Sequence, residues 1–180
     1  MKLLMMMAMT LAPMFAGAHA RLKASSTIQI RSTNPGIKSG PCGGLTRSAT
    51  PPVLISGQNL VIEFEETIFH PGRFEVYFSP AGEANFTLLK TIPQNPANTS
   101  LNVPHQFVTS VTLPNITCTD CTLQLIQVML ENPAVPSLYF SCADLQLKAA
   151  GTPVPTPTPS PIISPTVSPT ISPTPVCVPP

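Results

Sequence analysis

The stretch RFEVYF, residues 73–78, carries the clearest fold signal in the chain. Phe74, Val76 and Phe78 occupy alternate positions, and this period of two places one apolar face of a β-strand against a core. Aromatic and β-branched residues also favour strands over helices. The stretch therefore predicts a strand that is buried on one side.

Four further segments share this pattern. They are short, rich in β-branched or aromatic residues and bounded by clusters of Pro, Gly and Asn; they cover residues 59–65, 107–113, 122–129 and 138–147. No segment shows a helical stripe of ten or more residues. Regularly spaced short strands predict an all-β protein, an antiparallel β-sandwich.

Composition divides the chain into three parts. Lys2, an apolar run and small residues after it have the layout of a secretory signal peptide, and the run is too short to span a membrane. The last part repeats Pro, Thr, Ser and Val, which predicts a disordered, extended tail. We expect a signal peptide over 1–18, a single domain over 19–150 and the tail over 151–180. The protein should be secreted, and the tail could attach it to the cell envelope.

Charge argues against nucleic acid as a partner. The formal net charge is +1, charged residues make up 9% of the chain, and no basic stripe is present. A neutral surface suits uncharged partners.

Four cysteines lie inside the expected domain, which allows two disulfides in three pairings: Cys42, Cys118, Cys121 and Cys142. Cys142, in the last expected strand, is the preferred partner of Cys42 in the long glycine-rich segment 36–52. A zinc half-site at Cys118 and Cys121 is the alternative, but no second pair of ligands follows at suitable spacing. Cys177, in the tail, is a free thiol or an intermolecular link.

Two histidines could share a metal. Small residues allow the leader to be cut after Ala18 or after Ala20, and the first cut makes His19 the N-terminal residue. His70 stands in the tight turn Phe-His-Pro-Gly and, taken alone, is an ordinary surface histidine. A terminal His19 would offer its α-amino group and its ring Nδ1, and His70 would add a third nitrogen. Three such nitrogens favour copper.

The sequence resembles lytic polysaccharide monooxygenases, most closely the small bacterial proteins described as polysaccharide monooxygenase-like. The resemblance is carried, in order along the domain, by a start at His19 and by GPCGG (40–44), ETIFHPGRFEVYFSP (66–80), LPNITCTDCTLQLIQVM (113–129) and YFSCADLQL (139–147). It implies an immunoglobulin/fibronectin-like sandwich with a copper histidine brace. His19 and His70 match the brace, Tyr139 matches the residue that closes the axial side of the copper, and the cut should follow Ala18.

The resemblance also implies an activity. A monomer with one copper would use an external reductant to oxidise a sugar carbon beside a glycosidic bond in a polysaccharide such as chitin or cellulose. Tyr139 and Gln127 are the candidate catalytic residues, since the Gln127 amide could orient an oxygen ligand. Alternation within residues 122–129 equally allows Gln127 to be an outward polar residue.

Two other functions stay open. Brace proteins that bind or carry copper without oxidising glycans need the same nitrogens, and the lack of tryptophan favours them because a stacking platform is hard to build. A metal-free carbohydrate-binding or adhesion module held by the tail would leave both histidines unexplained. We expect His105 in a polar loop, and Glu63, Glu65 and Glu66 as solvated residues rather than hydrolase carboxylates.

Overall fold

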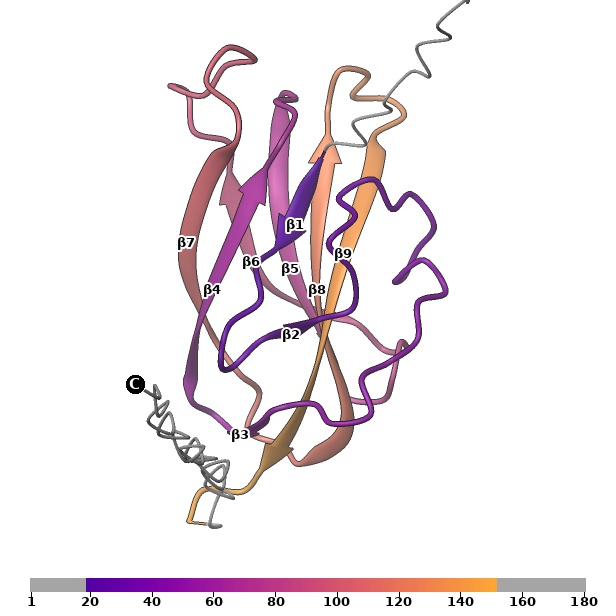
Figure 1. Ribbon diagram of the computed structural model, residues 1–180, viewed down its shortest axis with the longest axis vertical. Helices are drawn as coiled ribbons and strands as arrows, with labels where there is room; N and C mark the ends of the chain where they lie inside the picture. The colour runs from indigo at the N-terminus through magenta and orange to yellow at the C-terminus, as the bar shows by residue number, and fades with distance from the viewer. Residues whose placement is uncertain (1–18, 152–180) are drawn as a thin grey trace, which may run out of the picture.

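The alternation in residues 73–78 is present in strand β5 (Gly72–Ser79), where Phe74, Val76 and Phe78 are buried. The structure is a computed structural model that describes residues 19–151 of the 180-residue chain. In this part of the chain two β-sheets pack face to face, as Figure 1 shows.

The smaller sheet has three strands in the order β1 (Ala20–Leu22), β4 (Asn59–Glu66) and β7 (His105–Thr112). The larger sheet has the order β2 (Gln29–Ile30), β9 (Ser137–Lys148), β8 (Cys118–Met129), β5 and β6 (Thr87–Pro93), and β3 (Val53–Ile55) also pairs with β9. The strand pairs are antiparallel, apart from β3 and β9, which run parallel. The expected all-β sandwich is confirmed.

Four strands were not predicted. β1, β2 and β3 have only two or three residues each, which is too short for a period of two to show. β6 lies at the edge of the larger sheet and buries none of its residues fully, so its sequence TLLKTIP lacks a clear apolar face. All five strands that were predicted are present, and each is at least one residue longer than expected.

The main core fills the space between the two sheets. β4 contributes Leu60, Ile62 and Phe64 at alternate positions, and β5 contributes its three apolar residues from the other side. The rings of Phe64 and Phe74 meet edge to face with their centroids 5.0 Å apart, an arrangement that aromatic pairs prefer. This core holds β4 and β5 in place, and the turn between them carries His70.

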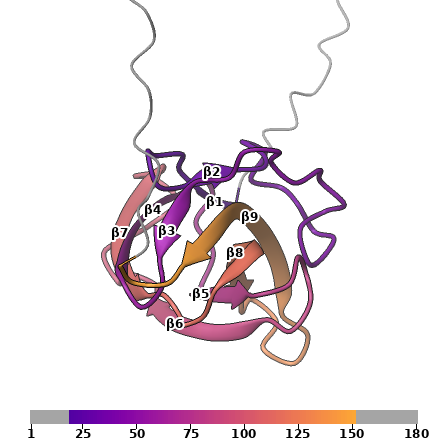
Figure 2. The same cartoon turned by 90° about the horizontal axis from the view of Figure 1, so that it is seen from below.

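The outer face of the larger sheet is covered as well. Figure 2 shows the segment between β2 and β3 lying outside β9. Cys42 in this segment forms the expected disulfide with Cys142 of β9, and Gln124 of β8 donates a hydrogen bond of 2.6 Å to the carbonyl oxygen of Pro41. The segment therefore gives β8 and β9 a second buried face.

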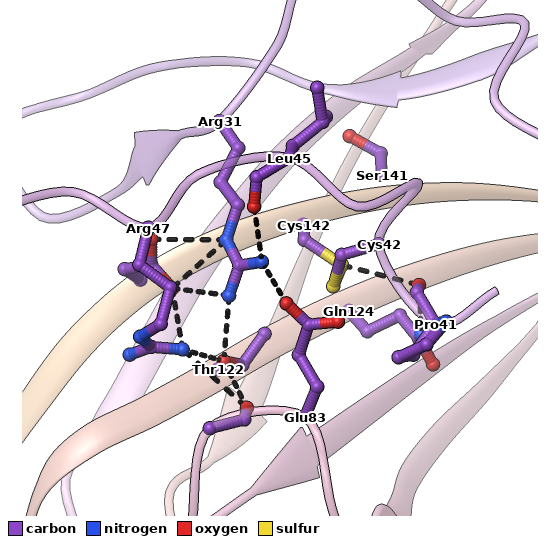
Figure 3. Close-up of a disulfide and its surroundings, with 12 residues drawn as sticks. Arg31, Pro41, Cys42, Leu45, Arg47, Glu83, Thr122, Gln124, Ser141 and Cys142 are labelled. Atoms are coloured by element: carbon purple, nitrogen blue, oxygen red, sulfur yellow. Dashed lines mark hydrogen bonds and ion pairs between the residues drawn. A yellow bond between two sulfur atoms is a disulfide. The ribbon is translucent and has the colours of Figure 1, made fainter. Parts of the chain in front are cut away.

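A buried ion network secures the same segment (Figure 3). The Arg31 side chain is 1% exposed and makes an ion pair of 2.8 Å with Asp144, which is fully buried. Arg47 adds an ion pair of 2.9 Å to Asp144, and the Ser48 N–H donates to the same carboxylate. Arg31 also pairs with Glu83. Both ends of the covering segment are thus attached to β9.

The structure joins Cys118 to Cys121 in a second disulfide at the start of β8, so these two sulfurs are not a zinc half-site. No helix within residues 19–151 is long and apolar enough to cross a membrane. The expected signal peptide and tail, with Cys177, lie outside the described residues, except for Gly151.

Candidate metal centre

His19 and His70 meet at the end of the sandwich where β4 ends and β5 begins. Ala20 pairs with Glu66, and the N–H of Thr67 donates a hydrogen bond of 3.0 Å to the carbonyl oxygen of His19. This places His19 beside the turn that carries His70. Two residues far apart in the sequence are therefore brought together by the pairing of β1 with β4.

The two imidazole rings lie nearly parallel. Their planes differ by 2° and their centroids are 5.0 Å apart. The ring of Tyr139, in β9, also stacks on His19 with an angle of 9° between the planes. All three residues that the sequence predicted around the metal therefore belong to one cluster.

This cluster contains buried polar atoms that lack partners. Across residues 19–151, three buried side-chain nitrogen or oxygen atoms make no hydrogen bond: Nδ1 of His19, Nε2 of His70 and Oε1 of Gln127. A buried polar atom without a partner is costly, and such atoms need an explanation such as an ion. A metal ion that bound to Nδ1 of His19 and to Nε2 of His70 would give both ring nitrogens a partner.

Glu131 determines which nitrogen of His70 is available. Nδ1 of His70 contacts the carboxylate of Glu131, in the turn after β8. A carboxylate accepts, so Nδ1 carries the proton and Nε2 keeps its lone pair when the ring is neutral. This carboxylate–histidine contact is the arrangement that orients metal-binding histidines in other proteins.

Gly72 allows the His70 turn to lie close to β8. A Cβ at this position would lie 2.0 Å from the carbonyl oxygen of Val128, so any other residue would collide with the backbone. The N–H of Leu130 also donates a hydrogen bond of 2.7 Å to the carbonyl oxygen of Pro71. The turn HPG is therefore fixed directly beside the strand that leads to Glu131.

Gln127 faces inward. It pairs with Phe74 of β5 on one side and with Tyr139 of β9 on the other, and residues directly opposite each other share one face of the sheet. The side chain is 1% exposed. The alternative that Gln127 is an outward polar residue is therefore wrong.

Glu66 was missed. We expected a solvated carboxylate, but Glu66 is fully buried beneath the His70 turn, whose backbone N–H contacts its Oε1 at 3.4 Å. Glu63 and Glu65 do lie on the outward face of β4, as expected. The sequence did contain a signal for this burial. Glu66 continues the alternation of Leu60, Ile62 and Phe64, so it lies on the same buried face of the strand.

His105 was also misplaced. It is the first residue of β7 rather than part of a loop, it is 5% exposed, and it lies directly opposite Glu66. Its Nδ1 contacts Glu66 Oε2 at 2.6 Å. Both ring nitrogens of His105 therefore have hydrogen-bond partners, whereas His19 and His70 each have a buried ring nitrogen without one.

The environment keeps the His19 ring neutral. The pKa of the His19 imidazole is lowered from 6.5 to about 4, mainly by burial and also by the charges of His70 and Lys38, while Glu131 opposes the change. Lys38 lies with its Nζ 5.0 Å from the centre of the Tyr139 ring. A neutral imidazole is the form that binds metals, so His19 is ready as a ligand well below neutral pH.

The ring nitrogens alone do not complete a metal site. Residues 19–151 contain no group of three or more His, Cys, Asp or Glu side chains that could hold an ion. The backbone nitrogen of His19 would become a third ligand if the chain were cut after Ala18. Two imidazoles and an amine are a donor set that suits copper, so the residues present fit this metal.

Comparisons with known proteins bear on the fold. Neither a protein-family model nor a curated protein matches the sequence. A cellulose-active polysaccharide monooxygenase from M. thermophila is 14% identical, with a TM-score of 0.46 over 73% of this chain and 67% of that chain. A lytic polysaccharide monooxygenase from Thermobia domestica, solved in the Cu(I) state, is 18% identical, with a TM-score of 0.41 over 64% of this chain and 78% of that chain.

A third solved structure, the cellulose-active monooxygenase CelS2 in complex with copper, is 19% identical, with a TM-score of 0.38 over 58% of this chain and 55% of that chain. At these identities, and with TM-scores below 0.5, the three solved structures are similar to this chain in part of the fold only.

Proposed function

We propose that the mature protein begins at His19 and binds one copper ion through the α-amino group and Nδ1 of His19 and Nε2 of His70. One observation supports this above the others: both ring nitrogens are buried without partners on nearly parallel rings 5.0 Å apart. Because the pKa of the His19 ring is lowered, the ring is already neutral near pH 7. The pH dependence of copper binding should therefore come from the α-amino group, whose ordinary pKa is near 8.

The activity that we propose is copper-dependent oxidation of a polysaccharide of the chitin or cellulose type, in a secreted protein supplied with an external reductant. Bound copper would supply the redox chemistry. The chain would hold the two imidazoles in place, Glu131 would fix the His70 tautomer, and Tyr139 would cover one side of His19 and exclude water there.

The first experiment is N-terminal sequencing of the secreted protein, followed by Cu(II) electron paramagnetic resonance. A start at His19 and an axial signal with nitrogen couplings are expected. The matched control is a chain that starts at Ala18, which keeps both rings but converts the amine into an amide. It should lose most of the affinity, as should His70→Ala. A natural start at Arg21 would contradict the brace and favour a metal-free binding module.

A copper-binding protein without glycan oxidation is the second candidate. The exposed large apolar residues within residues 19–151 are all aliphatic, among them Ile68, Leu101 and Val135. Aromatic rings that could stack on sugars are therefore lacking from this set. Incubating the copper-loaded protein and a reductant with a broad glycan panel separates the two candidates. Oxidised oligosaccharides support the monooxygenase, and their absence supports the copper carrier.

A further inference from the structure

Glu66 lies at the centre of the polar contacts beneath the candidate metal centre. Its side chain is fully buried, and a buried carboxylate is costly unless hydrogen bonds satisfy it. Oε1 accepts from Nε2 of Gln127 at 2.7 Å, both oxygens accept from Nε2 of Gln94 at 2.8 and 2.9 Å, and Oε2 contacts Nδ1 of His105 at 2.6 Å. Glu66 thus connects β4 to β7, to β8 and to the segment between β6 and β7.

The far side of His105 shows that a proton lies between this ring and the carboxyl group of Glu66. Nε2 of His105 lies 3.0 Å from the carbonyl oxygen of Thr99 and 2.7 Å from Oδ1 of Asn102. Oδ1 of Asn102 also accepts from the N–H of Thr99, so it is an acceptor. Nε2 must therefore carry a proton, and one further proton lies between Nδ1 and Glu66.

This arrangement leaves one orientation for the Gln127 amide. A carboxylate surrounded by donors accepts, so the Gln127 NH₂ group must face Glu66. Oε1 of Gln127 is then turned away, and it is buried without a partner. Gln127 lies directly opposite Tyr139, whose ring stacks on His19.

We propose that Glu66 is a positioning residue that turns Oε1 of Gln127 toward the histidine cluster as a hydrogen-bond acceptor. The group that it accepts from is an O–H donor bound there, such as water or an alcohol. The part that concerns a bound ligand rests on the proposed copper site, whereas the orientation of Gln127 does not.

The orientation can be tested on the copper-free protein by solvent exchange of the Gln127 side-chain NH₂ protons, followed by NMR. The wild-type protons should be protected. Glu66→Gln should speed their exchange about tenfold to a hundredfold, which is the loss expected for a hydrogen bond to a charged group. Glu65→Gln, one residue along on the outward face, is the matched control and should leave the exchange rate unchanged.

Rapid exchange of these protons in the wild-type protein would overturn the proposal, and this measurement requires no variant. The wild-type measurement therefore tests the proposal even if Glu66→Gln fails to fold. In the variant Glu66→Gln combined with Gln127→Glu, the amide and carboxylate exchange places, and recovery of a cooperative thermal transition would support their direct contact. No recovery, where Glu66→Gln alone unfolds, would count against it.

Copper loading tests the remaining part. With copper bound, Glu66→Gln and Gln127→Leu should both shift the Cu(II) paramagnetic resonance parameters, while Glu65→Gln should not. Unchanged parameters in both variants would overturn the role toward the ligand. Absence of any wild-type copper signal would instead refute the proposed function and leave the exchange result standing.

Discussion

Nδ1 of His70 donates to the carboxylate of Glu131, so the lone pair of the ring is on Nε2, the atom left buried without a partner. Glu131 is half-exposed, with 45% of its side chain accessible, yet it controls the chemistry of a more buried neighbour. The contact selects one tautomer of a residue that is otherwise free to adopt two.

Replacing Glu131 should therefore weaken copper binding. Glu131→Ala removes the acceptor, and we expect the affinity for Cu(II) to fall about 10-fold or more, within the range seen for such partners of metal-binding histidines. Glu131→Gln keeps an acceptor oxygen and should recover part of the loss. Competition with a chelator of known affinity measures both variants. An equal loss in Glu63→Ala, on the exposed face of β4, would show that the effect is only long-range charge.

The lowered pKa of His19 predicts how stability depends on pH. The unfolded ring titrates near 6.5 and the folded ring near 4, so the unfolded chain binds the proton first as the pH falls. The contribution is complete above pH 6.5 and is lost as the pH falls toward 4. Thermal unfolding of the copper-free protein should show this loss relative to His19→Gln, which cannot titrate. Equal pH profiles for both proteins would contradict the shift.

Lys38 contributes to that lowered pKa through its positive charge. Lys38→Gln should raise the pKa of the His19 ring, and NMR titration of the ring protons measures the change. Added salt should reduce the difference between the two proteins, because Coulomb interactions near the surface are screened. A pKa that is unchanged at low salt would leave burial and His70 as the causes of the lowering.

The two disulfides should differ in their effect on stability. Cys42–Cys142 closes a loop with a sequence separation of 100, whereas Cys118–Cys121 spans 3. Constraint of the unfolded chain predicts a loss of about 5 kcal/mol when the first is replaced by serines and about 2 kcal/mol for the second. Urea denaturation of both double-serine variants measures the difference. Equal losses would contradict the loop-length argument.

The buried ion pair gives a sharper contrast. Asp144→Asn removes the negative charge that pairs with Arg31, whose side chain is 1% exposed. This change should destabilise the fold by about 3–5 kcal/mol. Glu63→Gln breaks the exposed pair with Lys23 and should cost at most about 1 kcal/mol. Denaturation midpoints of the two variants provide the comparison. A small effect of Asp144→Asn would mean that Glu83, the other carboxylate paired with Arg31, is enough to compensate its charge.

The sequence predicted the strands that bury one face, because an apolar residue at every second position leaves a readable pattern. Phe74, Val76 and Phe78 are the clearest case. The pattern was harder to interpret in β8, where both faces are buried. There Gln127 could be placed inside only once its neighbours Phe74 and Tyr139 were known.

The site was predicted in part for a similar reason. His19 and His70 were predicted from motifs and Tyr139 from the family resemblance, and the three rings do meet. Glu66 and His105 were not, since each stabilises the other and neither looks buried when considered alone. A charged residue on the apolar side of a strand becomes interpretable only when its partner across the sheet is known.

The start of β1, which follows His19, and the end of β9 lie at opposite ends of the sandwich (Figure 1). β9 begins at Ser137, opposite Met129 and near Tyr139, and its 12 residues end at Lys148. A strand of that length spans roughly 40 Å. A partner that held the described domain at the end where β9 finishes would therefore lie at the opposite end of the sandwich from His19 and His70.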